Sequence, residues 1–168
     1  INFATSMVGH WYGGLGLAGV VACALFAAVS GSSPATVVAI GSILLPAMVR
    51  AGFPNRFGAG VISTSGALGI LIPPSIVMVM YSVATNTSVG ALFMAGVVPG
   101  IVLACVLGGV TWYRARKFDY PRQPKSSWGE RWKTFRASMW GLLLIVVVMG
   151  GIYTGIFTPT EAAAMSAV

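Results

Sequence analysis

Charged residues are scarce in this sequence, and long stretches lack them altogether. Only 8% of the 168 residues are charged, whereas 57% are hydrophobic. Residues 1–49, 57–113 and 137–160 contain no Asp, Glu, Lys or Arg. Because about a quarter of the residues in a soluble globular domain are charged, this composition excludes that class. The sequence predicts an all-α integral membrane protein.

Acids, histidine and cysteine are too few to build a reactive centre. The three acidic residues are spread over residues 119–161, and His10 is the single histidine. Cys23 and Cys105 lie in apolar runs without a second Cys or His at the spacing of a metal site, so we interpret both as small buried hydrophobes. A hydrolase needs a base close to its nucleophile. We predict that the chain is not an enzyme and has no cofactor.

The net charge of +7 comes from basic residues that are confined to two segments. Eight of the ten lie in 114–136, and the other two are Arg50 and Arg56. A basic patch can bind nucleic acid, but here apolar runs flank both segments. Basic loops between membrane spans are typical of the cytoplasmic side. We therefore place 50–56 and 114–136 in the cytoplasm and predict no nucleic-acid partner.

Two short apolar runs, 11–29 and 34–49, meet at a small polar turn, Ser30-Gly31-Ser32-Ser33-Pro34. As helices, each would be only about 22 to 28 Å long at 1.5 Å per residue, whereas the hydrocarbon core measures about 30 Å. We therefore expect a re-entrant hairpin over 11–49, whose turn lies inside the membrane. Ser33 is expected to be the N-cap of the second helix and Pro34 its first residue.

The next apolar run, 57–88, is too long for one simple crossing, at about 48 Å as a helix. It contains two interruptions, Ser63-Thr64-Ser65-Gly66 with Gly69, and Ile72-Pro73-Pro74-Ser75. We predict two half-helices with an unwound segment somewhere between Ser63 and Ser75, and the alternative is an ordinary Pro-kinked helix. Residues 85–90 would then form a periplasmic turn, and 90–113 would cross back.

The rest of the sequence predicts a basic loop and one further crossing. Residues 114–137 should contain a short amphipathic helix in the lipid interface, because Trp128, Trp132 and Phe135 alternate with basic residues. Residues 138–168 should then cross the membrane and begin a further helix. Thr158 and Glu161 fit a capping box, although Glu161 could instead be a functional carboxylate. The first residue is not Met and the last lies within an apolar run, so we expect an internal fragment.

Hydroxyl and carbonyl oxygens without a carboxylate suit a monovalent cation better than Ca²⁺, which prefers acidic ligands. Sodium is the usual ion bound by unwound carbonyls and half-helix ends in transporters, and helix N-termini can bind an anionic substrate. We predict a Na⁺ site that involves Ser32, Ser33 and Gly66. The full candidate set for Na⁺ and substrate is Ser30, Gly31, Ser32, Ser33, Ser63, Thr64, Ser65, Gly66, Gly69, Pro73, Pro74 and Ser75.

Four stretches of this sequence carry a resemblance to a known family. They are 27–36 (AAVSGSSPAT), 41–48 (GSILLPAM), the two ends of 63–75 (STSG and IPPS), and 151–162 (GIYTGIFTPTEA). Together they resemble the large membrane subunit of tripartite ATP-independent periplasmic (TRAP) transporters. The resemblance implies a bacterial inner-membrane protein that imports organic acids such as C4-dicarboxylates or sialic acid by a Na⁺-coupled elevator mechanism. It also implies two partners, a small membrane subunit and a periplasmic substrate-binding protein.

The resemblance further implies two inverted repeats, of which residues 1–113 would be the first. The second hairpin and its Na⁺ site would lie outside this chain, so we do not expect it to transport alone. Two other functions stay open. One is a Na⁺/carboxylate symporter that needs no binding protein, and the other is a structural or channel subunit.

Overall fold

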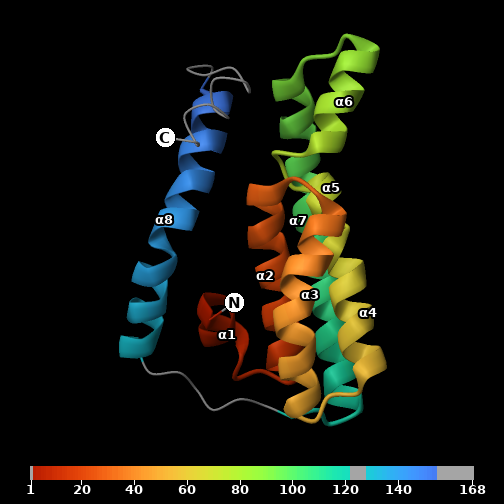
Figure 1. The fold of residues 1–168 in the computed structure, drawn as a ribbon, viewed down its shortest axis with the longest axis vertical. Coiled ribbons are helices and arrows are strands. Elements are labelled where there is room, and N and C mark those ends of the chain that lie inside the picture. The colour runs from red at the N-terminus through yellow and green to blue at the C-terminus, as the bar shows by residue number, and fades with distance from the viewer. Residues whose placement is uncertain (1, 122–127, 155–168) are drawn as a thin grey trace.

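The computed structural model describes residues 2–121 and 128–154, and all regular structure in these residues is helical. This confirms the predicted all-α class. The elements along the chain (Figure 1) are α1 Asn2–Val8, α2 Gly14–Ser30, α3 Ser33–Arg50, α4 Asn55–Gly66, α5 Leu68–Leu71, α6 Ile76–Thr85, α7 Val89–Lys117 and α8 Trp128–Tyr153.

Helices α2 and α3 form an antiparallel hairpin whose turn is Gly31 and Ser32. Gly31 ends α2 in the left-handed conformation (φ 61°), and its N–H donates to the Ala27 carbonyl over 2.9 Å. Helix α3 begins one residue earlier than predicted, with Ser32 rather than Ser33 as its N-cap and Pro34 as its second residue. Ser32 is extended and makes no side-chain capping bond, so the hydroxyl does not act as the expected cap.

The turn between α3 and α4 has the geometry of a Schellman motif. Gly52 has φ 92°, its N–H donates to the Val49 carbonyl over 3.0 Å, and the N–H of Phe53 donates to the Met48 carbonyl over 3.0 Å. Only glycine adopts this conformation without strain, and the two bonds satisfy carbonyls at the helix end. Gly52 therefore ends α3.

The crossing 57–88 is interrupted rather than continuous. Helix α4 runs through Ser63 to Gly66, the single turn of α5 ends at Leu71, and α6 starts only at Ile76. The non-helical segment is thus 72–75, the later of the two predicted interruptions, where two prolines remove consecutive backbone donors. The interruption at 63–66 stays helical.

Helix α7 is the longest element of the bundle, with 29 residues and a length of about 43 Å. It packs beside the interrupted crossing, where Gly96 and Gly100 let it approach the backbone of Leu71 and the side chain of Ile72. Figure 1 shows that the α2–α3 turn reaches only part of the way along α7, to the level of α5. The turn therefore lies within the length of the bundle and not at its end.

In the described part of the chain, three segments are long and apolar enough to cross a membrane, namely Ser33–Arg50, Asn55–Thr85 and Val89–Lys117. Helix α3, with its 18 residues, is therefore long enough to span, contrary to the expectation from its length. The re-entrant path of the hairpin stays a prediction.

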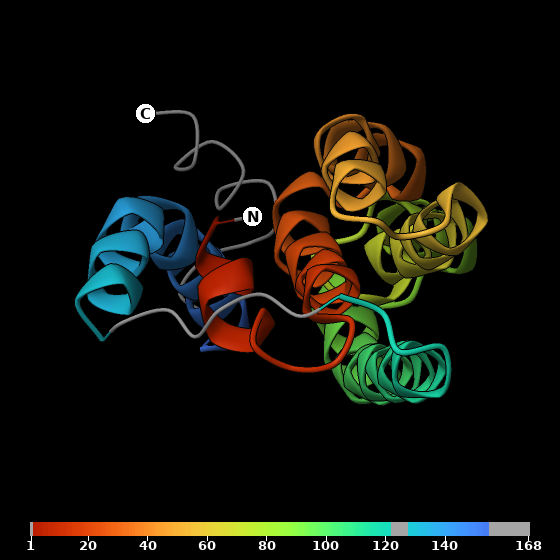
Figure 2. The same ribbon diagram turned by 90° about the horizontal axis from the view of Figure 1, so that it is seen from below.

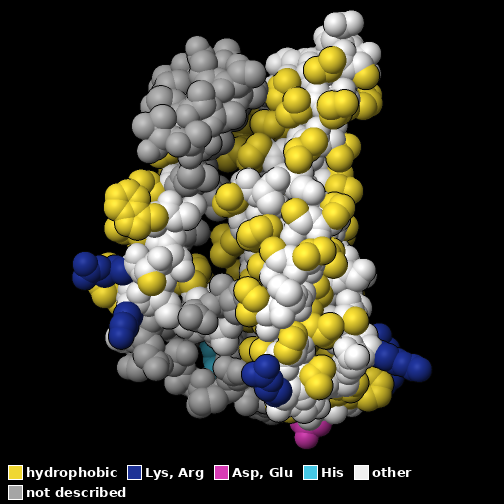
Figure 3. All heavy atoms as spheres, viewed as in Figure 1, with side chains coloured by type: hydrophobic (Ala, Val, Ile, Leu, Met, Phe, Trp, Pro, Cys, Tyr) yellow, Lys and Arg dark blue, Asp and Glu magenta, His cyan; other side chains and the backbone are white. Residues whose placement is uncertain are grey.

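The charged residues of the bundle gather at one end. Arg50 ends α3, Arg56 lies at the start of α4, and Arg114, Arg116 and Lys117 lie in the last turns of α7. Figure 3 shows Lys, Arg and acidic side chains at this end and none along the upper part of the bundle. The α3–α4 turn therefore lies at the basic end of the bundle, and the α6–α7 turn lies at the opposite end.

Helix α8 is joined to the bundle mainly through α1. Figure 2 shows α1 between α8 and the hairpin. The rings of Phe3 and Phe135 lie 5.8 Å apart, and the hydroxyls of Ser6 and Thr134 are 3.2 Å apart. The amphipathic segment expected around Trp132 and Phe135 is not a separate short helix. It is continuous with the start of the crossing predicted from residue 138, and both lie in the single helix α8 of 26 residues.

Candidate functional site

The candidate site lies where the hairpin turn meets the interruption of the crossing helix. The Gly31 carbonyl accepts a hydrogen bond from the N–H of Ile76, the first residue of α6, over 3.1 Å. This bond connects the end of α2 to the start of the second half-helix. It joins two segments more than 40 residues apart in the sequence, at the level of α5 in Figure 1.

Glycine residues allow the two backbones to approach this closely. A Cβ atom at Gly31 would lie 2.6 Å from the carbonyl oxygen of Pro74, and one at Gly69 would lie 2.8 Å from the carbonyl carbon of Ser32. At Gly66 a Cβ would overlap the side chain of Val37 and come within 3.4 Å of the Ser33 carbonyl oxygen. Backbone atoms cannot move aside as a flexible side chain can, so Gly31 and Gly69 require glycine, whereas the closest contact at Gly66 is with the Val37 side chain.

Two hydroxyl groups in this region are buried without a partner. Ser65 is 0% exposed and Ser75 is 1% exposed, and neither Oγ has a hydrogen-bond partner among the described residues. Ser75 immediately precedes Ile76, and Ser65 immediately precedes Gly66. Since an unpaired buried hydroxyl costs about 1 to 3 kcal/mol, such groups call for an explanation, and an unseen ion or water is a common one.

The predicted residues separate into those that meet and those that do not. The structure brings together Gly31, Ser32, Ser33, Gly66, Gly69 and the 73–75 segment. Ser63 is exposed and lines a groove between α3 and α4. Thr64 is also exposed, and its hydroxyl donates to the Gly60 carbonyl over 2.8 Å.

Sequence reasoning missed Thr36, which is fully buried at 0% exposure. Its hydroxyl donates to the Ser32 carbonyl over 2.8 Å and lies 3.1 Å from the Ser30 hydroxyl. The signal was present, because residues four apart share one face of a helix. A hydroxyl four residues after Ser32 is therefore placed to reach back to the turn.

The oxygens at this junction fit a monovalent cation. They are hydroxyls and backbone carbonyls, and no group of three His, Cys, Asp or Glu residues that could hold a metal ion occurs in the described part of the chain. A site without carboxylates is poorly suited to Ca²⁺. Neutral oxygens beside an interrupted helix match the coordination that transporters use for Na⁺.

A comparison with protein families identifies the chain's relatives. The model of the family described as "Tripartite ATP-independent periplasmic transporter, DctM component" matches residues 1–168. The chain belongs to this family. The resemblance seen in the four sequence stretches is thereby confirmed, and this DctM-family chain is an integral protein of the bacterial inner membrane, as predicted.

Curated relatives of this DctM-family chain carry several substrate names. It is 72% identical to the "C4-dicarboxylate TRAP transporter large permease protein DctM" of Rhodobacter capsulatus, covering 100% of this chain and 41% of the relative. It is 44% identical to the "Ectoine TRAP transporter large permease protein TeaC" of Halomonas elongata, covering 98% and 38%. It is 38% identical to the "2,3-diketo-L-gulonate TRAP transporter large permease protein YiaN" of Escherichia coli, covering 99% and 39%.

The chain thus spans about two fifths of the length of these relatives. The predicted capping pair Thr158 and Glu161 lies outside the described residues, and the division into repeats stays a prediction. What the geometry describes is one hairpin, one interrupted crossing and the contact between them.

Proposed function

We propose that this chain is part of the large permease of a Na⁺-coupled TRAP transporter that imports an organic acid. The observation that carries the proposal is the junction of Gly31 with Ile76, flanked by the buried, unpartnered hydroxyls of Ser65 and Ser75. In a protein of the DctM family, such a junction can bind a cation inside the membrane. The protein acts as a permease and not as an enzyme.

We propose a C4-dicarboxylate as the substrate class, because the relative with 72% identity carries that name. Relatives with 44% and 38% identity carry the names of ectoine and 2,3-diketo-L-gulonate, so the membrane scaffold accommodates different solutes across the family. The free N–H groups at the start of α6 would attract a carboxylate. The proposed partners are a small membrane subunit and a periplasmic binding protein that delivers the acid.

The distribution of charge supports the proposed orientation. The basic end of the bundle would face the cytoplasm, and the uncharged turn 85–90 would face the periplasm. The hairpin turn and the start of α6 are hydrogen-bonded to each other. They would therefore move as one unit in an elevator-type mechanism, which carries the bound ion and substrate across together.

Energetics favour the coupling of at least two Na⁺ ions to each dicarboxylate. One Na⁺ that enters down about 100 mV contributes about 2.3 kcal/mol, and a tenfold gradient adds about 1.4 kcal/mol. Moving a dianion inward against the membrane potential costs the free energy that two Na⁺ ions release in moving down it. The concentration gradients of the two Na⁺ ions then remain to drive uptake.

The test is uptake of radiolabelled succinate by the complete transporter in proteoliposomes, with binding protein outside and an inward Na⁺ gradient. We expect accumulation that disappears when choline replaces Na⁺, and Na⁺-independent uptake would refute the coupling. Uptake that needs no binding protein would indicate the simpler symporter, and equilibration without accumulation would indicate a channel.

The serines of the turn provide a residue-level test. Ser32→Ala and Ser33→Ala should each raise the Na⁺ concentration for half-maximal uptake, by roughly fivefold, because each removes one neutral oxygen from the site. Assembly of the complex, followed by size-exclusion chromatography, should be unchanged. An unaltered Na⁺ dependence in both variants would move the ion away from this turn.

A further inference from the structure

The hairpin turn is held by a closed ring of hydrogen bonds that centres on Thr36. The Ser32 N–H donates to the Ser30 hydroxyl over 3.4 Å, the Ser30 and Thr36 hydroxyls are 3.1 Å apart, and the Thr36 hydroxyl donates to the Ser32 carbonyl over 2.8 Å. The Thr36 N–H donates to the same carbonyl over 3.1 Å. Three residues thus satisfy one another inside the turn.

The hydroxyls of Ser30 and Thr36 are both engaged inside the turn. The Thr36 hydroxyl donates to the Ser32 carbonyl. The Ser30 hydroxyl accepts from the Ser32 N–H and also lies 3.5 Å from the Ser32 carbonyl oxygen. Either hydroxyl can donate in the contact between the two side chains, so both side chains serve the conformation of the turn.

The junction contains two kinds of hydroxyl group. Ser30 and Thr36 are engaged with the turn, whereas Ser65 and Ser75 are buried without partners. The turn that Ser30 and Thr36 hold includes Gly31, whose carbonyl accepts the Ile76 N–H. A change in the ring would therefore shift the backbone that faces the start of α6.

We infer that Thr36, together with Ser30, is a positioning residue that holds the hairpin turn in the conformation required for ion binding. Thr36 touches neither ion nor substrate in this assignment, and it acts through the backbone of residues 30–32. This changes the predicted role of Ser30, which becomes part of the support rather than a ligand. The ionic part of the inference rests on the proposed function.

The test compares Thr36→Val, which keeps the β-branched shape and loses the hydroxyl, with Thr36→Ser, which keeps the hydroxyl. In the complete transporter, Thr36→Val should raise the Na⁺ concentration for half-maximal uptake by about tenfold. The maximal rate at saturating Na⁺ should change by less than about twofold. Thr36→Ser should stay within about twofold of the wild type in both quantities.

Thr85→Val is the matched control. The Thr85 hydroxyl also donates to a carbonyl four residues earlier, that of Tyr81, over 2.8 Å, but it is exposed at the end of α6. Its loss should leave the Na⁺ dependence unchanged. Ser30→Ala should resemble Thr36→Val, and the double variant should be little worse than either single one, because both changes open the same ring.

A second measurement does not depend on sodium. Amide hydrogen exchange in the complete transporter should show faster exchange at residues 30–36 in Thr36→Val than in the wild type, with Thr36→Ser close to the wild type. Unchanged exchange and Na⁺ dependence in Thr36→Val would overturn the inference. If wild-type uptake ignores Na⁺, the proposed function fails, and the exchange measurement still decides whether Thr36 holds the turn.

Discussion

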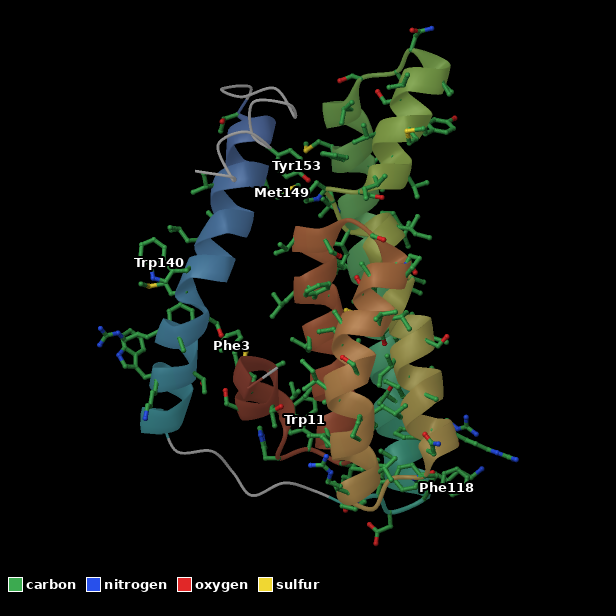
Figure 4. The ribbon with its side chains drawn as sticks, in the orientation of Figure 1. Phe3, Trp11, Phe118, Trp140, Met149 and Tyr153 are labelled. Atoms are coloured by element: carbon green, nitrogen blue, oxygen red, sulfur yellow. The ribbon has the colours of Figure 1, made fainter. Side chains whose placement is uncertain are left out.

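The hairpin junction and the α8 side of the molecule are built in opposite ways. At the junction, Gly31 and Gly69 lie directly against the backbone of a neighbouring segment, and the hydroxyls of Ser30 and Thr36 bond within the turn. Along α8, side chains of α1 make the contacts, and a mainly apolar cavity of about 340 Å³ remains between α8, α1 and the hairpin. Figure 4 shows Trp140 pointing away from the bundle, whereas Met149 and Tyr153 lie on the side that faces it.

The difference shows where this fold tolerates change. Close backbone contact leaves no room for even a methyl group, so substitutions at the junction should lower the stability of the protein strongly. Side-chain contacts around a cavity can rearrange, so the α8 side should respond weakly. The proposed ion site would need the first kind of construction, because binding requires fixed oxygen positions.

The largest effect is expected from Gly31→Val. Valine would have to adopt φ 61° and place its Cβ beside the Pro74 carbonyl oxygen, which together should lower the free energy of unfolding by about 3 to 5 kcal/mol. Thermal melting of the purified complex would measure this. Gly60→Ala is the control, since nothing lies within 4 Å of its Cβ position. A melting temperature of Gly31→Val equal to that of the wild type would contradict the close contact.

A medium effect is expected at the basic end of the bundle, where Tyr120 lies among three phenylalanine rings. Its centroid is 4.8 Å from that of Phe57, 5.5 Å from that of Phe53 and 5.9 Å from that of Phe118. Tyr120→Ala should cost about 2 kcal/mol, because it removes a ring that connects the end of α7 to the α3–α4 turn. Tyr120→Phe should melt like the wild type, and equal losses in both variants would mean that the hydroxyl matters more than the ring.

The smallest effect is expected on the α8 side. Ser6→Ala removes the contact with the Thr134 hydroxyl and the bond to the Phe3 carbonyl, and should lower stability by no more than about 1 kcal/mol. Trp140→Ala, at a side chain that is 78% exposed, should change it by less than about 0.5 kcal/mol. Melting curves of both variants in one detergent would measure these changes. A loss at Ser6 as large as that at Gly31 would remove the contrast between the two regions.

Much of the fold could be read from local sequence signals. The stop at Gly52 and the interruption at Pro73 and Pro74 follow from backbone chemistry that acts within a few residues. The 63–66 stretch was harder to judge, because small polar residues are compatible with both helix and loop. It stayed helical, and the side chains of Ser63 and Thr64 are exposed. Their exposure depends on how α4 is rotated against α3, which the local sequence does not specify.

The sequence by itself determined that this protein lies in a membrane, where its helices are interrupted and which end carries the positive charge. These properties follow from hydrophobicity, proline geometry and the placement of arginine and lysine, all of which are local. Only the tertiary structure decided that the Gly31 carbonyl bonds to Ile76, that Thr36 supports the turn, and that Ser65 and Ser75 are left without partners. The bond to Ile76 and the burial of Ser65 and Ser75 depend on contacts between distant segments. The Thr36 contacts are local, but the direction of its side chain is visible only in the structure.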